Sequence, residues 1–187
     1  MDKRRLLAGL LILFTGCAGL RPEGEVVRVE RPAPPADGKV RVGKGYVDFV
    51  APTLDGSEIR LSSLVGRHVV LLQFWGIRCA PCLAEMKFLS GLQRRFGARG
   101  LRVLAVNTDR VDAESLKRAM ERRNLDPPFP VLLDPDFGIS RHYTRWLIPV
   151  TVLIDREGVV RAVHTGYRAE MDELIVKEVA ALLGKGA

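Results

Sequence analysis

The chain has 187 residues, enough for one domain with a sizeable core and a short additional segment. Its formal net charge is +7, with 29 lysines and arginines against 22 acidic residues. The arginines are scattered and no nucleic-acid-binding motif accompanies them, so the composition argues against DNA or RNA as a partner and favours a solvated basic surface near anionic lipid.

The N-terminus is typical of an exported protein. Basic residues at positions 3–5 precede the apolar stretch 6–14, which is too short for a membrane span of about 20 residues. Small residues at positions 15–16 then stand before Cys17. This layout predicts a signal peptide over residues 1–16; an uncleaved anchor, or an ordinary signal without lipid, is the alternative.

Cys17 at the cleavage position resembles the lipid-modified first residue of a mature bacterial lipoprotein. Lipidation there would remove the odd member of the three cysteines and leave one pair, and export suits disulfide chemistry. Residues 17–40 contain four prolines and no sustained period, which predicts a lipidated, extended tether; Val26, Val27 and Val29 are open to an edge strand instead. The predicted location is the bacterial cell envelope, lipid-anchored on the exported, periplasmic side of the membrane.

Residues 41–187 alternate strand-like and helix-like segments. Apolar runs and turn residues predict strands over residues 46–53, 58–61, 68–75, 101–107, 131–133, 151–154 and 159–164. Helical spacing and caps predict helices over residues 80–96, 112–123, 137–143 and 170–183, with a brief turn at 62–66. The order predicts one α/β domain in which helices flank a mixed central sheet.

Two cysteines separated by two residues, Cys79 and Cys82, follow the apolar run 69–75. If a helix begins at this motif, Cys79 lies at its N-terminal end, where unpaired backbone N–H groups and the helix dipole favour the thiolate. Pro81 fits the first turn because its missing N–H is not needed there. Cys82 then lies inside the first turn as the resolving thiol. The pattern predicts a redox-active pair.

Two other roles of this pair are open on the residues alone. A purely structural disulfide would close a very small loop and stabilise the fold little. A structural zinc site needs four ligands and usually a second close pair. The other candidate ligands are isolated in sequence: Cys17, His68, His142 and His164. We therefore predict no metal and no cofactor, and we expect His142 and His164 to be ordinary surface or hairpin residues.

The element order and the motif together resemble the thioredoxin fold, and within it the exported TlpA/ResA-like disulfide reductases. The resemblance covers residues 44–184 and rests on the segment 74–86, on the turns at Asp55-Gly56 and Gly158, and on residues 148–151. Three positions depart from the family pattern. Arg78 replaces a usual tryptophan, Lys87 a frequent proline, and Gln73 the buried aspartate of cytoplasmic thioredoxins, which the exported branch also lacks.

The resemblance implies a membrane-tethered thiol–disulfide oxidoreductase that reduces disulfides of envelope proteins. Cys79 attacks and Cys82 resolves the mixed disulfide. A membrane thiol donor supplies electrons, and the clients include apocytochrome c or another protein of cytochrome c maturation. Pro149 is expected to be cis and to face the Cys79 sulfur, with neighbouring backbone offered to a client strand.

Glu85 follows Cys82 by three residues and so shares its helix face. A carboxylate there can take the Cys82 proton, provided that partial burial raises its pKa toward neutrality; an exposed surface glutamate is the alternative. Arg78 would favour the Cys79 thiolate if its charged head points inward, and would do nothing as a surface residue.

Two further function classes compete with disulfide reduction. A peroxiredoxin-like antioxidant shares the architecture, but such proteins use a lone attacking cysteine in a different loop. A copper-handling thioredoxin-fold module would use Cys79 and Cys82 with Met86 or His164. Relatives of that kind space their cysteines by three residues, and this chain spaces them by two.

Overall fold

The computed structural model of the chain describes residues 32–33 and 35–184. The predicted signal peptide, Cys17 and the valines of the alternative edge strand lie outside the described residues, as does most of the predicted tether.

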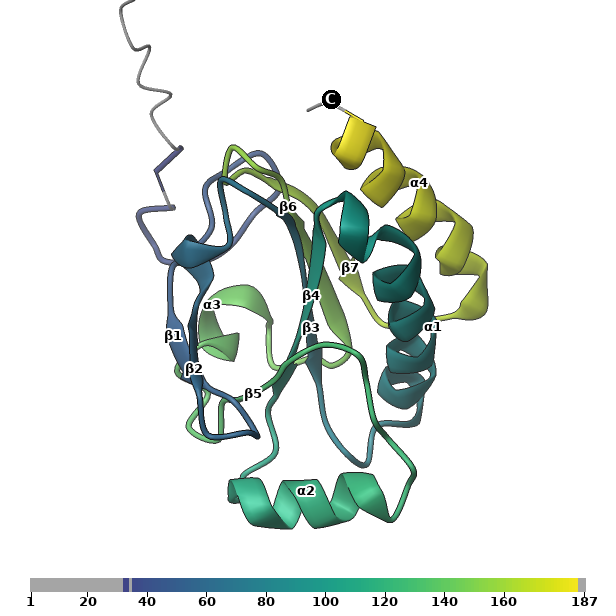
Figure 1. The fold of residues 1–187 in the computed structure, drawn as a ribbon. Coiled ribbons are helices and arrows are strands. Elements are labelled where there is room, and N and C mark those ends of the chain that lie inside the picture. Colours follow the sequence, from purple (N-terminus) through teal and green to yellow (C-terminus); the bar gives the residue numbers. More distant parts are fainter. Residues whose placement is uncertain (1–31, 34, 185–187) are drawn as a thin grey trace, which may run out of the picture.

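In the described part of the chain, five strands form a mixed sheet in the order β5-β4-β3-β6-β7. The central strand β3 runs parallel to β4 and antiparallel to β6 (Figure 1). The sheet strands are β3 (Val69–Trp75), β4 (Leu101–Asn107), β5 (Val131–Leu133), β6 (Val150–Ile154) and β7 (Val160–Thr165). Two shorter strands, β1 (Val50–Pro52) and β2 (Glu58–Arg60), form a separate antiparallel pair.

Helices cover both faces of the sheet. Figure 1 shows α1 and α4 side by side on one face, and α3 with the β1–β2 pair on the other. The helices are α1 (Ala80–Phe96), α2 (Ala113–Glu121), α3 (Ser140–Tyr143) and α4 (Asp172–Gly184), with 3-10 turns η1 (Leu61–Ser63), η2 (Gly97–Arg99) and η3 (Ala169–Met171). The predicted fold class is therefore confirmed.

The strand β3 is buried along its whole length because both of its faces are covered. Alternate side chains point to opposite faces of a strand, so Leu71 and Trp75 join the core under α1 and α4. Leu72 and Phe74 join the second core, which includes Tyr143 of α3. Burial on two faces explains why this strand is an unbroken apolar run in the sequence.

Three loops meet at one edge of the sheet. The parallel strands β3 and β4 end there together, with Trp75 opposite Asn107. The antiparallel strand β6 begins at the same edge, with Val150 opposite Phe74. The segment before β6 therefore lies beside the segments that follow β3 and β4, and the edge is the place where distant parts of the sequence converge.

Three predicted elements are shorter than expected by more than one residue. β1 begins only at Val50, because the backbone N–H of Tyr46 bonds to Gly158 instead of pairing in a hairpin. The predicted helix 137–143 is reduced to α3, because Phe137 has a φ of 57°, which is left-handed and incompatible with a right-handed helix. The predicted helix 112–123 ends at Glu121.

Candidate active site

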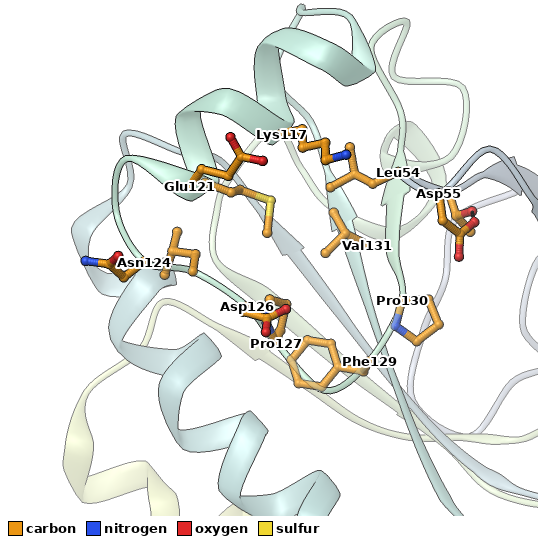
Figure 2. A pocket seen from close by; sticks show the side chains of 13 residues that line it. Leu54, Asp55, Lys117, Glu121, Asn124, Asp126, Pro127, Phe129, Pro130 and Val131 are labelled. Atoms are coloured by element: carbon orange, nitrogen blue, oxygen red, sulfur yellow. Dashed lines mark hydrogen bonds between the residues drawn. The ribbon is translucent and has the colours of Figure 1, made fainter.

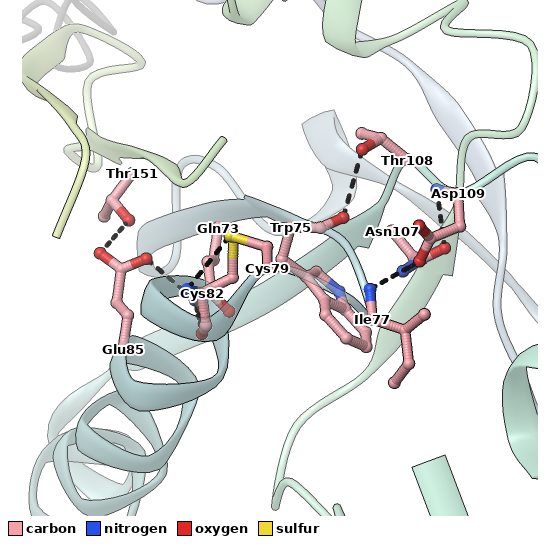
Figure 3. Close-up of a disulfide and its surroundings, with 10 residues drawn as sticks. All are labelled: Gln73, Trp75, Ile77, Cys79, Cys82, Glu85, Asn107, Thr108, Asp109 and Thr151. Carbon is pink, nitrogen blue, oxygen red and sulfur yellow. Dashed lines mark hydrogen bonds between the residues drawn. A yellow bond between two sulfur atoms is a disulfide. The ribbon is translucent and has the colours of Figure 1, made fainter. Parts of the chain in front are cut away.

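The two cysteines of the motif are joined by a disulfide with an S–S distance of 2.01 Å (Figure 3). Cys79 is the N-cap of α1, and its sulfur accepts a hydrogen bond of 3.3 Å from the backbone N–H of Cys82. Pro81 lies in the first turn, as predicted. Cys79 is half-buried and Cys82 is fully buried, so an approaching molecule meets Cys79 first. The helix N-terminus supplies the N–H donors and dipole that favour a thiolate at Cys79 once the pair is reduced.

The loop between β3 and the disulfide is held by Asp109, which follows β4. The Asp109 carboxylate accepts hydrogen bonds from the backbone N–H of Ile77 at 2.7 Å and from Asn107 Nδ2 at 2.8 Å (Figure 3). Gly76 allows the close approach, because a Cβ there would lie 3.1 Å from both Asp109 Oδ1 and Ile148 Cδ1. The sequence analysis missed Asp109; its place after a buried strand at the sheet edge was the available signal.

Glu85 is fully buried, so the alternative of an exposed surface glutamate is wrong. Its carboxyl oxygens accept a hydrogen bond of 2.7 Å from Thr151 Oγ1 and one of 2.9 Å from Gln73 Nε2 (Figure 3). The same Gln73 nitrogen donates to the carbonyl of Cys82 at 3.0 Å. Burial raises the pKa of Glu85, and the hydrogen bonds from Thr151 and Gln73 partly oppose the rise. The direction of the pKa shift is the one expected of a proton acceptor beside Cys82.

His164 belongs to the surroundings of Glu85. It is the cross-strand partner of Thr151 in the β6–β7 pair, and its Nε2 lies 2.8 Å from Glu178 Oε2 on α4. A positive charge on His164 lowers the pKa of Glu85, whereas the charge of Asp172 raises it. His164 was expected to be an ordinary hairpin residue. It is half-buried and belongs to a polar group that extends from Glu85 to α4.

His142 lies on the opposite side of the sheet from this polar group. Its Nδ1 lies 2.8 Å from the Gly38 carbonyl, and the residue belongs to α3. It has no contact with the disulfide environment drawn in Figure 3.

The peptide bond between Ile148 and Pro149 is cis, as predicted. Continuing the β3–β6 register by one residue from Phe74 and Val150 places Pro149 beside Trp75, where the disulfide loop begins. The Pro149 carbonyl accepts a hydrogen bond of 2.8 Å from the Gly166 N–H. Among the described residues, the Ile148 backbone has no hydrogen-bond partner, so its N–H and carbonyl are available at the sheet edge.

The chain is similar to known proteins in sequence. The model of the AhpC/TSA family matches residues 42–163, well over half of the chain. The chain belongs to the AhpC/TSA family. A relative named thiol-disulfide oxidoreductase ResA, from Halalkalibacterium halodurans, is 33% identical over 143 residues, covering 76% of this chain and 77% of the relative.

Solved structures agree with this assignment. A protein of Chlorobium tepidum assigned as thiol:disulfide interchange protein DsbE has 30% identity and a TM-score of 0.72, covering 78% of this chain and 100% of that one. A secreted disulfide oxidoreductase of Mycobacterium tuberculosis, homologous to Escherichia coli DsbE, has 27% identity and a TM-score of 0.60, covering 72% and 96%. This member of the AhpC/TSA family is a thiol–disulfide oxidoreductase of the ResA/DsbE type with the thioredoxin fold.

The oxidoreductase also has a hollow of about 660 Å³, and neither cysteine of the disulfide lines it (Figure 2). Leu54, Met120 and Val131 contribute apolar side chains to it, and Lys117 and Glu121 add charges. None of the side chains that line it belongs to the disulfide environment of Figure 3, so we assign it no part in the redox chemistry.

Residues 32–33 and 35–184 contain neither a candidate metal site nor a candidate membrane-spanning helix. Among the described residues, no group of three or more histidine, cysteine, aspartate and glutamate side chains is arranged to hold a metal ion. No helix in the described part of the protein is both long and apolar enough to cross a membrane.

Proposed function

We propose that the protein is a membrane-tethered thiol–disulfide oxidoreductase that reduces disulfides in other proteins of the bacterial cell envelope. The observation that carries the proposal is the asymmetry of the cysteine pair at the start of α1. Cys79 is half-buried, caps the helix and receives an N–H hydrogen bond, whereas Cys82 is fully buried. One cysteine is thus suited to attack a client, and the other to resolve the product.

The exchange begins with the reduced pair. The Cys79 thiolate attacks one sulfur of a client disulfide, and the other client sulfur leaves as a thiolate. The Cys82 thiolate then attacks Cys79 Sγ in the mixed disulfide, and the second client sulfur leaves. Two electrons pass to the client, and the pair ends as the disulfide seen in the structure. A membrane thiol donor restores the reduced pair by the same exchange in reverse order.

Glu85 is proposed to accept the proton of Cys82 before the second attack. Both residues lie on α1, one turn apart, and Gln73 donates hydrogen bonds to both. Because burial raises the pKa of Glu85, its carboxyl can hold the proton at a pH at which an exposed glutamate would release it. Pro149 is proposed to turn the chain so that the neighbouring backbone is offered to a client, since it stands at the end of β3 where the disulfide loop begins.

The finer parts of the proposal rest on the sequence. Cys17 is proposed to carry the lipid, and residues 17–40 to act as a tether on the periplasmic side of the membrane. The resemblance to exported disulfide reductases supports apocytochrome c, or another protein of cytochrome c maturation, as a client. We propose no nucleic-acid partner.

The two alternative functions receive less support. In a copper module Met86 or His164 would assist the cysteines, but Met86 is 2% exposed in the core and His164 is bonded to Glu178. A peroxiredoxin-like mechanism would need an attacking cysteine in another loop. The only cysteine outside the pair is Cys17, in the N-terminal segment.

The full chain in detergent, assayed for reduction of insulin with a thiol donor, tests the proposal. Wild-type protein is expected to turn over, Cys79→Ser to be inactive, and Cys82→Ser to accumulate a mixed disulfide with the substrate. A redox titration is expected to give a midpoint near that of thioredoxin, about −270 mV, as for a reductant. A midpoint near −120 mV, or turnover by Cys79→Ser, would contradict it.

A further inference from the structure

Three consecutive apolar side chains are exposed just before Pro149. Trp146 is 70% exposed, Leu147 53% and Ile148 39%, and Trp146 is the most exposed large hydrophobic side chain of the described residues. We call these three residues the apolar ridge. Soluble proteins expose single apolar side chains freely, but a contiguous group marks a surface that contacts another molecule.

Trp146 of the ridge and Phe137, which its ring contacts, both have an unfavourable backbone conformation. Trp146 has a φ of 63° and Phe137 a φ of 57°, both in the left-handed region that bulky side chains rarely occupy. The two rings contact each other edge to face, with centroids 5.4 Å apart, and the Arg110 guanidinium lies 4.8 Å from the centre of the Phe137 ring. This row of three side chains supports Trp146 while leaving it exposed. Such conformations persist where a functional site requires them.

The ridge is continuous with the active site. Ile148 Cδ1 would lie 3.1 Å from a Cβ on Gly76, so its side chain packs over the loop that leads to Cys79. Pro149 stands beside Trp75 in the extended register of β3 and β6. A chain segment whose disulfide reaches Cys79 therefore passes next to the ridge, where the Ile148 backbone groups are unpaired among the described residues.

The margin of the ridge is positively charged. Arg78 precedes Cys79, Arg145 precedes Trp146, and Arg110 covers Phe137; all three are exposed. We call them the basic rim. No acidic side chain of the described residues forms an ion pair with any of them. Two acidic side chains line the same hollow as Arg110. Asp112 is engaged as the N-cap of α2, where it accepts hydrogen bonds from Ser115, and the exposed Asp136 forms no ion pair with Arg110. The rim is therefore available to carboxylates of a partner.

We propose that the apolar ridge and the basic rim form the client-recognition surface, and that they select an extended segment with an apolar or aromatic side chain and acidic residues next to its disulfide. The inference rests on the proposed disulfide-reductase function and names its substrate class. Exposed aromatic side chains are frequent binding hot spots, and unpaired arginines at their margin steer and select acidic partners.

Two peptides test the charge preference of the full-length reduced protein. Each carries one internal disulfide and one phenylalanine; glutamates flank the disulfide in one peptide, and lysines replace them in the other. A small organic disulfide without a peptide serves as the reference substrate. Wild-type protein is expected to have a higher kcat/KM for the acidic peptide, and the preference is expected to fall as salt screens the rim.

Two variants with matched controls test the surface. Trp146→Ser is expected to lower the ratio of peptide to small-disulfide kcat/KM by about 10-fold or more, as loss of an aromatic anchor does. Leu174→Ser, at an exposed leucine of α4, is expected to leave the ratio unchanged. Arg145→Glu is expected to remove the charge preference, and Arg94→Glu, which makes the same change near the far end of α1, to retain it.

The outcomes distinguish failure of the proposed recognition surface from failure of the proposed disulfide-reductase function. Wild-type protein that exchanges with neither the peptides nor the small disulfide would overturn the proposed function. Normal exchange with all three substrates, but with the same ratio in Trp146→Ser, would overturn the recognition surface alone. Light scattering tests whether a second copy of the chain occupies the ridge. A wild-type dimer that Trp146→Ser makes monomeric, with an unchanged ratio of peptide to small-disulfide kcat/KM, would also overturn the recognition surface.

Discussion

Thr151 donates a hydrogen bond of 2.7 Å to the buried carboxyl of Glu85, and this contact joins the strand after Pro149 to the helix that begins at Cys79. The two residues are separated by 66 positions in the sequence. A change in the proton occupancy of Glu85 therefore acts on both parts of the site at once, because a carboxylate accepts two hydrogen bonds here and a neutral acid must also donate its own proton.

Replacing Glu85 by glutamine is expected to slow turnover at the resolving step. A proton acceptor next to Cys82 assists the second attack, and such assistance contributes about 100-fold or more. Alkylation of Cys79 in the reduced protein, followed by mass spectrometry at neutral pH, is expected to stay near the wild-type rate. The fold should survive, because the oxygen of the new amide can still accept from Gln73 Nε2, and its nitrogen can donate to the Thr151 hydroxyl oxygen. A wild-type turnover rate in Glu85→Gln would show that the carboxyl takes no part.

The stability of the protein is expected to fall as the pH rises through the titration of Glu85. Its folded-state pKa is raised by burial, so the folded protein binds the proton more tightly than the unfolded chain does. The stabilising contribution is complete below the unfolded pKa and is lost as the pH rises through the raised folded pKa. Urea denaturation of oxidised wild-type protein and Glu85→Gln at several pH values measures this. Between the unfolded and the folded pKa of Glu85, the free energy of unfolding of the variant is expected to increase relative to that of the wild type as the pH rises.

Thr151→Val provides a second test of how the free energy of unfolding depends on the titration of Glu85. The variant removes a hydrogen bond that lowers the pKa of Glu85, so the loss of stability should move to a higher pH than in the wild type. A stability difference between wild type and Glu85→Gln that does not change with pH would contradict the raised pKa.

The parts of the fold that depend on local chemistry were predictable from the sequence. The central strand is an apolar run ended by Gly76, and α1 begins at a cysteine cap followed by Pro81, so the predicted helix 80–96 matches the structure. The segment 137–143 failed as a seven-residue helix because Phe137 has a left-handed backbone, and its ring contacts that of Trp146, nine residues later. No local pattern carries that information.

The candidate site divides in the same way. The cysteine pair, the cis bond at Pro149 and the position of Glu85 on the helix face of Cys82 were predicted from spacing and resemblance. The partners of these residues were not. Thr151 and Asp109 reach the site only because the sheet brings β6 and β4 to the same edge as β3. The exposure of Trp146 and Leu147 was not predicted, since it depends on how the chain turns before β6.

Cys17→Ser is expected to release the protein from membranes. The apolar stretch before Cys17 is too short to span a bilayer, so the proposed acyl chains would supply most of the anchoring. Expression in a bacterium that processes lipoproteins, followed by membrane fractionation and intact-mass measurement, tests the expectation. Unchanged membrane extraction, with no added mass at Cys17 in the wild type, would remove lipidation from the proposal. Thr15→Ser is a matched control, because it keeps a small residue before the cleavage position.

Asp109→Ala is expected to loosen the loop that presents Cys79. The change removes the acceptor for the Ile77 N–H and for Asn107 Nδ2, two donors in the partly buried edge of the sheet. Leaving such donors unpaired costs about 1–3 kcal/mol, so the urea midpoint of the oxidised protein should fall measurably.

Asp109→Asn retains one acceptor oxygen and is expected to lose less stability than the alanine variant. Exchange with a disulfide peptide should slow in the same order, because Asp109 holds the Ile77 N–H, and Ile77 lies in the loop that leads to Cys79. Equal stability and equal exchange rates in wild type and Asp109→Ala would mean that the loop keeps its position without this carboxylate. A loss of stability with normal exchange would instead place Asp109 in the scaffold alone, since the presentation of Cys79 would then not depend on it.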